Sequence, residues 1–111
     1  MKPRIEPELN TAQKSPLQQL AQAFAVLDNA EQVQAFLQDL CTPAELEAMA
    51  DRWRVVPLLR EAVPYREIHE RTGVSVTTTG RVARTLEHGA GGYAAAIERL
   101  ATANVSTRET P

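Results

Sequence analysis

Apolar residues recur at helical spacing through the first part of the chain, and each run begins at a residue that favours a helix start. Ser15 followed by Pro16 is such a start, because a serine oxygen can accept from free N–H groups while proline has no N–H to leave unsatisfied. The apolar stripe that follows predicts an amphipathic helix over 16–28. A second stripe predicts another helix over 30–41.

The third helix has the strongest start signal in the chain. The sequence TPAE at 42–45 combines a capping box with a proline at the first helical position. Apolar residues then continue to about residue 60, which predicts a helix over 43–60 with Trp53 in the core or at a subunit interface. Pro57 lies inside this run, so we expect either a kink there or two consecutive helices.

The second half of the chain predicts three further helices. They are expected over 65–71, over 76–88 and from Tyr93 to about Ala101. Gly73 can adopt the left-handed conformation that ends the first, and Ser75 can cap the second. Because no β-type alternation occurs, the sequence predicts an all-α fold of about six helices.

Length and polarity suggest one folded domain with polar ends. The 111 residues predict a flexible tail over 1–13, a helical domain over 14–102 and a second flexible tail over 103–111. The first ten residues lack the apolar stretch typical of a signal peptide, and no apolar run is long enough to cross a bilayer. A lone cysteine, Cys41, cannot form an internal disulfide. We therefore expect a cytoplasmic protein with no membrane partner.

Charge is distributed unevenly along the chain, although the formal net charge is only −2. Residues 1–50 are acidic, whereas residues 51–90 contain seven arginines and five acidic residues. The planar guanidinium of arginine suits phosphates and guanine edges. Scattered arginines can equally form an ordinary solvated helix face, so charge alone leaves both interpretations open.

The segment EIHERTGVSVTTTGRVARTL indicates a helix-turn-helix over 64–88. Short hydroxyl and methyl side chains at the start of the second helix could approach base edges, and arginines farther along could reach phosphates. The alternative is an ordinary helical corner with exposed threonines. Thr79 favours that alternative slightly, because a buried β-branched hydrocarbon usually occupies this position of the motif.

The chain from TPAEL at residue 42 to the GAGGY segment resembles the Trp repressor superfamily, and its shorter YerC/YecD branch in particular. The resemblance covers about residues 30–95 and rests on LCTPAEL, the R-x-R pair, the G-V-S turn, Arg81 and the L-x-x-G ending. It implies an intertwined all-helical homodimer that presents two recognition helices to successive major grooves of double-stranded DNA.

The resemblance also implies which residues bind DNA. Val76, Thr77 and Gly80 fall where the family approaches operator bases, and Arg66 and His69 fall on the DNA-facing side of the preceding helix. Longer side chains beyond them are assigned to the backbone phosphates. The full predicted set is Arg66, His69, Val76, Thr77, Gly80, Arg81 and Arg84.

The co-repressor pocket of the family maps onto Thr42, Arg52, Arg81, Val82 and Thr85. Val82 stands where the family has glycine, and its isopropyl group would intrude on the space for a flat indole ring. The pocket is then either closed, with its arginines serving DNA and internal pairing, or open to a smaller anion. We expect no cofactor and no response to tryptophan. The sequence does not decide whether another small-molecule effector binds.

Other chemistry is not indicated. Cys41, His69 and His88 do not have metal-ligand spacing, and the glycines at 89–92 follow a helix rather than a strand. We predict neither catalytic residues nor a metal site. Two functions remain: a homodimeric sequence-specific DNA-binding regulator, a repressor in type, or a helical protein-interaction module that has kept the scaffold and lost DNA binding.

Overall fold

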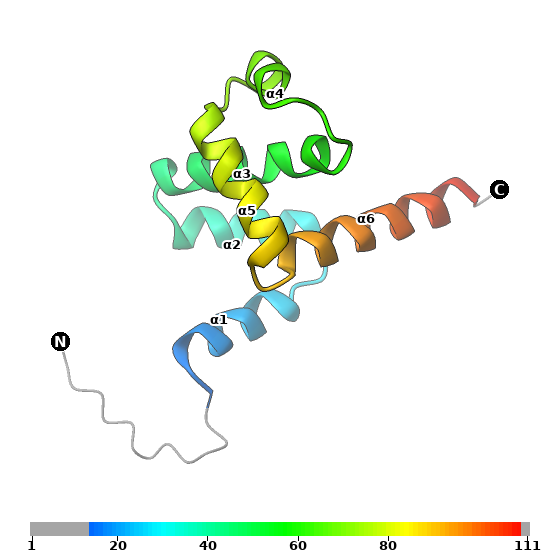
Figure 1. The fold of residues 1–111 in the computed structure, drawn as a ribbon. Helices are drawn as coiled ribbons and strands as arrows, with labels where there is room; N and C mark the ends of the chain where they lie inside the picture. The colour runs from blue at the N-terminus through cyan, green and yellow to red at the C-terminus, as the bar shows by residue number, and fades with distance from the viewer. Residues whose placement is uncertain (1–13, 110–111) are drawn as a thin grey trace. The chain divides into compact units, whose positions relative to one another are not determined.

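The structure, a computed structural model, describes residues 14–109, and helices account for most of them (Figure 1). The helices are α1 (Pro16–Ala25), α2 (Ala30–Leu40), α3 (Pro43–Arg60), α4 (Tyr65–Thr72), α5 (Val76–His88) and α6 (Gly92–Glu109). The described residues contain no strand, so the predicted all-α fold is confirmed. None of the described helices is both long and apolar enough to cross a bilayer. The tail predicted over 1–13 lies outside the described residues.

The chain divides into two compact units, the first ending at Thr42 and the second beginning at Pro43. In the first unit, Ser15 Oγ accepts from Gln18 N at 3.1 Å and Gln18 Oε1 accepts from Ser15 N at 2.8 Å, which forms the capping box of α1. Helix α1 ends at Ala25, three residues before its predicted end. Asn29 then caps α2 by accepting from Gln32 N at 2.8 Å.

The two helices of the first unit contain no buried residue. Phe24 and Phe36 meet edge to face, with ring centroids 5.1 Å apart, and this aromatic pair links α1 to α2. Leu17 and Val26 remain 74% and 76% exposed. Much of the apolar surface of this unit is therefore uncovered within one chain.

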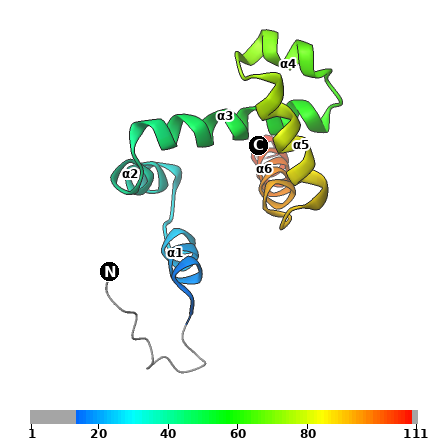
Figure 2. The ribbon, with the colours of Figure 1, turned by 60° about the vertical axis from the view of Figure 1, so that its left-hand side comes forward.

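The second unit has a small hydrophobic core. Its buried apolar residues come from α3, α4, the following turn and α5, and they are Val55, Val56, Ile68, Val74 and Val82. Helix α5 packs across α3 and against α4, so the three helices enclose this core (Figure 2). Pro57 is exposed, and α3 continues through it to Arg60. The alternative of two separate helices is therefore wrong.

The end of α3 sets the entry of the chain into α4. Val63 N donates to Leu58 O at 3.0 Å and Ala62 N donates to Leu59 O at 3.0 Å, which is the Schellman pattern. Ala62 occupies the left-handed position of this motif with φ of 62°. Alanine is disfavoured there relative to glycine, so this turn depends on the packing of the flanking helices.

Helix α6 is longer than predicted, since it extends to Glu109 instead of ending near Ala101. The helix therefore extends into the segment 103–111, for which the sequence predicts a flexible tail, while residues 110 and 111 lie outside the described part. Alanines favour continuation of the helix, and no glycine or proline follows until Pro111. At its start, Tyr93 packs beside the half-buried Trp53, with ring centroids 6.4 Å apart.

Candidate nucleic-acid interface

Helices α4 and α5 form a helix-turn-helix whose turn begins at Gly73. Gly73 has φ of 78°, and its N–H donates to His69 O at 2.8 Å, which ends α4. A side chain at this left-handed position would be strained, so glycine is the residue that fits the turn. The predicted role of Gly73 is confirmed.

Three further hydrogen bonds hold the turn in place. Thr72 Oγ1 donates to Ile68 O at 2.7 Å and accepts from Val74 N at 3.0 Å. The Val74 carbonyl accepts from His69 Nδ1 at 2.9 Å, and the Val74 side chain is buried in the core. Both polar groups of the Val74 backbone are therefore satisfied, which fixes the direction in which α5 leaves the turn.

The start of α5 is stabilised by Ser75, as the sequence predicts. Ser75 Oγ accepts from Thr78 N at 3.0 Å and donates to Thr78 Oγ1 at 3.0 Å. Thr79 is fully buried, and its hydroxyl donates to Ser75 O at 3.0 Å. Thr79 thus fills the buried β-branched position of the motif with its polar group satisfied. A threonine at position 79 therefore does not favour the alternative of an ordinary helical corner.

The two sides of α5 differ in exposure. Thr79 and Val82 face the core, while another set of residues lies on the outer side at spacings of three and four. We call this set the outer face of α5, and it consists of Val76, Thr77, Gly80, Arg81 and Arg84. All five are among the predicted DNA-binding residues, and all are exposed except Gly80, which is half-buried.

The predicted residues on α4, Arg66 and His69, are also exposed. His69 differs from the expectation in one respect, because its Nδ1 atom is already bonded within the turn. The ion pair of α4 joins Arg71 to Glu67, with Nη2 and Oε2 2.6 Å apart. In the described part of the chain, no ion pair involves Arg66, Arg81 or Arg84.

Sequence reasoning did not identify Tyr65, the first residue of α4, as part of this surface. Tyr65 is 40% exposed, and a methyl group placed at Gly80 would lie 3.7 Å from its Cε2 atom. The Tyr65 ring therefore borders the outer face of α5 at Gly80, the residue of that face without a side chain. No local pattern indicates this contact, because it joins residues fifteen positions apart.

Two of the residues mapped to the co-repressor pocket lie at the same cavity. Arg81 and Thr85 line an open cavity of about 270 Å³ together with Arg84, His88 and Gly89. Val82 is 1% exposed and belongs to the core, so it does not line this cavity. Arg52 is half-buried on α3, and Thr42 belongs to the first unit.

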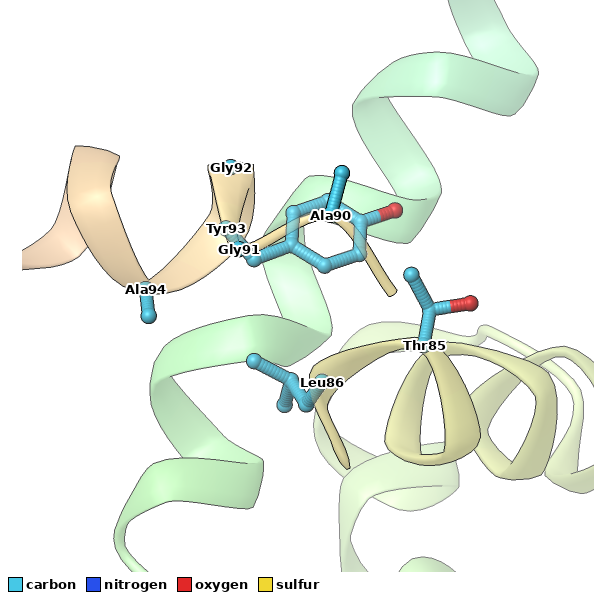
Figure 3. A pocket seen from close by; sticks show the side chains of 7 residues that line it. All are labelled: Thr85, Leu86, Ala90, Gly91, Gly92, Tyr93 and Ala94. Atoms are coloured by element: carbon cyan, nitrogen blue, oxygen red, sulfur yellow. The ribbon is translucent and has the colours of Figure 1, made fainter. Parts of the chain in front are cut away.

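A second open cavity, of about 320 Å³, lies where α5 is followed by α6 (Figure 3). Its lining is mainly apolar and consists of Thr85, Leu86, Ala90, Gly91, Gly92, Tyr93 and Ala94. Figure 3 shows the side chains of Thr85 and Leu86 from α5 and of Tyr93 and Ala94 from α6 around this space. Among the described residues, no three His, Cys, Asp or Glu side chains are grouped as metal ligands would be.

Comparison with known proteins identifies the family. The uncharacterized protein YerC of Bacillus subtilis is 37% identical over 84 residues, which span 76% of this chain and 81% of YerC. A TrpR-like protein from Eubacterium eligens has 38% identity and a TM-score of 0.71, over 77% of this chain and 88% of that one. A protein proposed to be a Trp repressor, from Staphylococcus aureus, has 29% identity and a TM-score of 0.71, over 89% of this chain and 95% of that one. The family described as Trp repressor protein matches residues 15–101, and the chain belongs to this family of DNA-binding regulators.

Proposed function

We propose that this protein is a sequence-specific transcription regulator, a repressor in type, that binds double-stranded DNA as a homodimer through α4 and α5. The observation that carries the proposal is the outer face of α5. There, small side chains lie at the start of the helix, and two exposed arginines without ion pairs in the described part lie one and two turns farther on. A recognition helix requires this order, because bases are approached by its N-terminal end and phosphates by its longer side chains.

A second copy of the chain is the partner that the exposed first unit favours. Leu17 and Val26 are among its most exposed apolar side chains, and neither α1 nor α2 buries any residue. Apolar helix faces of this kind are stabilised when another surface removes them from water. Family membership favours the same arrangement, and a two-fold symmetric dimer would present two copies of α5 to one duplex.

The proposal includes no catalytic step and no tryptophan response. Val82 fills the core with an isopropyl group at the position where the resemblance implies glycine. A flat ring that needs that space would have to displace packed side chains, which is costly in a dense core. The cavity lined by Arg81 and Thr85 has room for an anionic effector smaller than tryptophan. As a chromosomal regulator, the protein would act in the cytoplasm.

A protein-interaction module is the second candidate, and the formal net charge of −2 favours it. A negative chain is repelled by DNA at long range, so local arginines must outweigh its average charge. The exposed apolar surface of the first unit also suits a protein partner. This candidate predicts partner binding without any affinity for duplex DNA.

A mobility-shift assay tests the proposal. Purified protein is mixed with a pool of genomic fragments that includes its own promoter, and with a random duplex of equal length, at low and at physiological salt. We expect a discrete complex with a few fragments that survives physiological salt, and weak binding to the random duplex that does not. A protein that ignores every fragment at low salt would support the interaction module instead.

A further inference from the structure

We propose that Val76 and Thr77 select operators by contacting the C5-methyl groups of thymines in the major groove. This inference rests on the proposed function and adds the base feature that is recognised. The first turn and a half of the outer face of α5 carries methyl groups but no amide or guanidinium group.

The side chains that read other bases by paired hydrogen bonds are missing from the start of α5. Guanine is read by arginine or lysine, and adenine by asparagine or glutamine, each through two hydrogen bonds to one base. Helix α5 contains no lysine, asparagine or glutamine, and its first arginine is Arg81, more than one turn after Val76. The base-approaching end of α5 therefore has few ways to distinguish guanine or adenine directly.

Two of the hydroxyl groups in this segment already have partners. Thr78 Oγ1 accepts from Ser75 Oγ, and Thr79 Oγ1 donates to Ser75 O inside the core. Thr77 is exposed, and its side chain carries one methyl and one hydroxyl group. Apart from the Thr77 hydroxyl, the outer face therefore offers apolar groups at this end of the helix, those of Val76 and Thr77.

Val76 is well placed for an apolar contact. It is the first residue of α5, 48% exposed, and it directly follows the capping residue Ser75, whose hydrogen bonds fix the backbone. A β-branched side chain has few χ1 rotamers to lose, so its methyl groups are ordered before DNA binds. Thymine is the base that offers an apolar group in the major groove. Contact with it would remove the exposed isopropyl group from water.

The test replaces thymine by deoxyuracil, which removes one methyl group and leaves base pairing intact. Each thymine of a selected operator is replaced singly, and the dissociation constant is measured by fluorescence anisotropy. We expect a three- to fivefold loss of affinity at one or two positions of each half-site, the size expected for one buried methyl group. At those positions, Val76→Ala or Thr77→Ser should bind the thymine and uracil duplexes about equally.

Thr102→Ala serves as a matched control, because it also shortens an exposed β-branched side chain, on α6. This variant should keep the uracil sensitivity of the wild type. If the wild type binds the operator and no uracil position changes its affinity, the inference is wrong while the proposed function stands. If the wild type binds no duplex at all, the proposed function fails and this inference fails with it.

Discussion

The two compact units of this chain differ in how they are stabilised. The second unit buries five apolar residues among α3, α4 and α5, and its helix-turn-helix is held by hydrogen bonds on both sides of Val74. The first unit buries no residue of α1 or α2, although Phe24 and Phe36 pack together. The unit that we propose binds DNA has its own core, whereas the helices of the unit that we propose joins the subunits contain no buried residue.

This difference indicates how one short sequence can divide its apolar residues between two tasks. A core of a few valines and one isoleucine is small, since a domain of about 100 residues normally buries about two thirds of its unfolded surface. Seven further apolar side chains are partly buried against this core, whereas α1 and α2 contain no buried residue. Dimerisation would complete the burial, so folding and assembly should be coupled.

The largest effect is expected in the core of the second unit. Ile68→Ala removes a fully buried side chain between α4 and the rest of the core, and it should lower the free energy of unfolding by about 2–5 kcal/mol. Urea denaturation at a fixed protein concentration measures this loss. Val76→Ala, at an exposed position of α5, should change the free energy of unfolding by less than about 0.5 kcal/mol. Equal losses in the two variants would show that this unit has no core of its own.

A smaller effect is expected on the outer face of α5, where two substitutions should act differently. Arg84→Gln removes a cation assigned to phosphate and should weaken binding to all duplexes alike. Thr77→Ala should instead change the preference among operators, by about 1–3 kcal/mol. Anisotropy titrations with a selected operator, a mismatched operator and a random duplex separate these effects. Loss of preference in Arg84→Gln alone would reverse the two assignments.

Substitutions in the first unit should act on the formation of the dimer. Leu40 is 49% exposed in the single chain, so a partner could bury about half of its side chain. Leu40→Ala should therefore weaken dimerisation by about 1–2 kcal/mol. Sedimentation equilibrium measures the dissociation constant, with Gln38→Ala as an exposed control on the same helix. A wild-type protein that sediments only as a 12.2 kDa species at micromolar concentration would contradict the proposed dimer.

Gly80 allows stability and DNA binding to be separated. A methyl group there would lie 3.7 Å from Cε2 of Tyr65, an ordinary contact distance, so Gly80→Ala should fit. Alanine is the better helix former, and the variant should be more stable by about 0.5–1 kcal/mol. We expect weaker operator binding despite this gain, because the added methyl group would lie where we propose that the bases approach. Higher stability with unchanged DNA affinity would place Gly80 outside the DNA interface.

The smallest expected effect is that of L-tryptophan. Titration calorimetry should detect no binding to the wild type, and tryptophan should leave the operator affinity unchanged. Val82→Gly would open space in the core beside α5, and circular dichroism is needed to confirm that this variant remains folded. Binding by a folded Val82→Gly variant alone would show that the valine closes the pocket. Micromolar binding to the wild type would show that the steric argument is wrong.

The parts of the fold that local signals determine were predictable from the sequence. The capping residues Ser15 and Ser75 and the left-handed Gly73 each act on nearby backbone groups, and the structure confirms their roles. The end of α6 was not predictable from turn residues, because no glycine or proline lies between Ala101 and Pro111. Local patterns mark where helices start more reliably than where they end without a glycine or proline.

Long-range packing limited what the sequence could reveal about the site. Spacing along a helix was sufficient to group Val76, Gly80 and Arg84 on one side of α5, since residues three and four apart share a face. It was not sufficient to find Tyr65, whose contact with Gly80 joins two helices, or to place Val82 in the core rather than in a cavity. The Tyr65–Gly80 contact and the burial of Val82 both depend on how α4 and α5 pack against each other and against α3.

The central claim is that the outer face of α5 binds duplex DNA, and the salt dependence of binding tests it most directly. Fluorescence anisotropy with a selected operator over about 50–200 mM salt gives the slope of log affinity against log salt concentration. We predict steep salt dependence for the wild type and a slope smaller by about 1 for each phosphate-contacting arginine removed, in Arg84→Gln and then in Arg81→Gln. Slopes that do not change in either variant, or no binding by the wild type at 50 mM salt, would contradict the account.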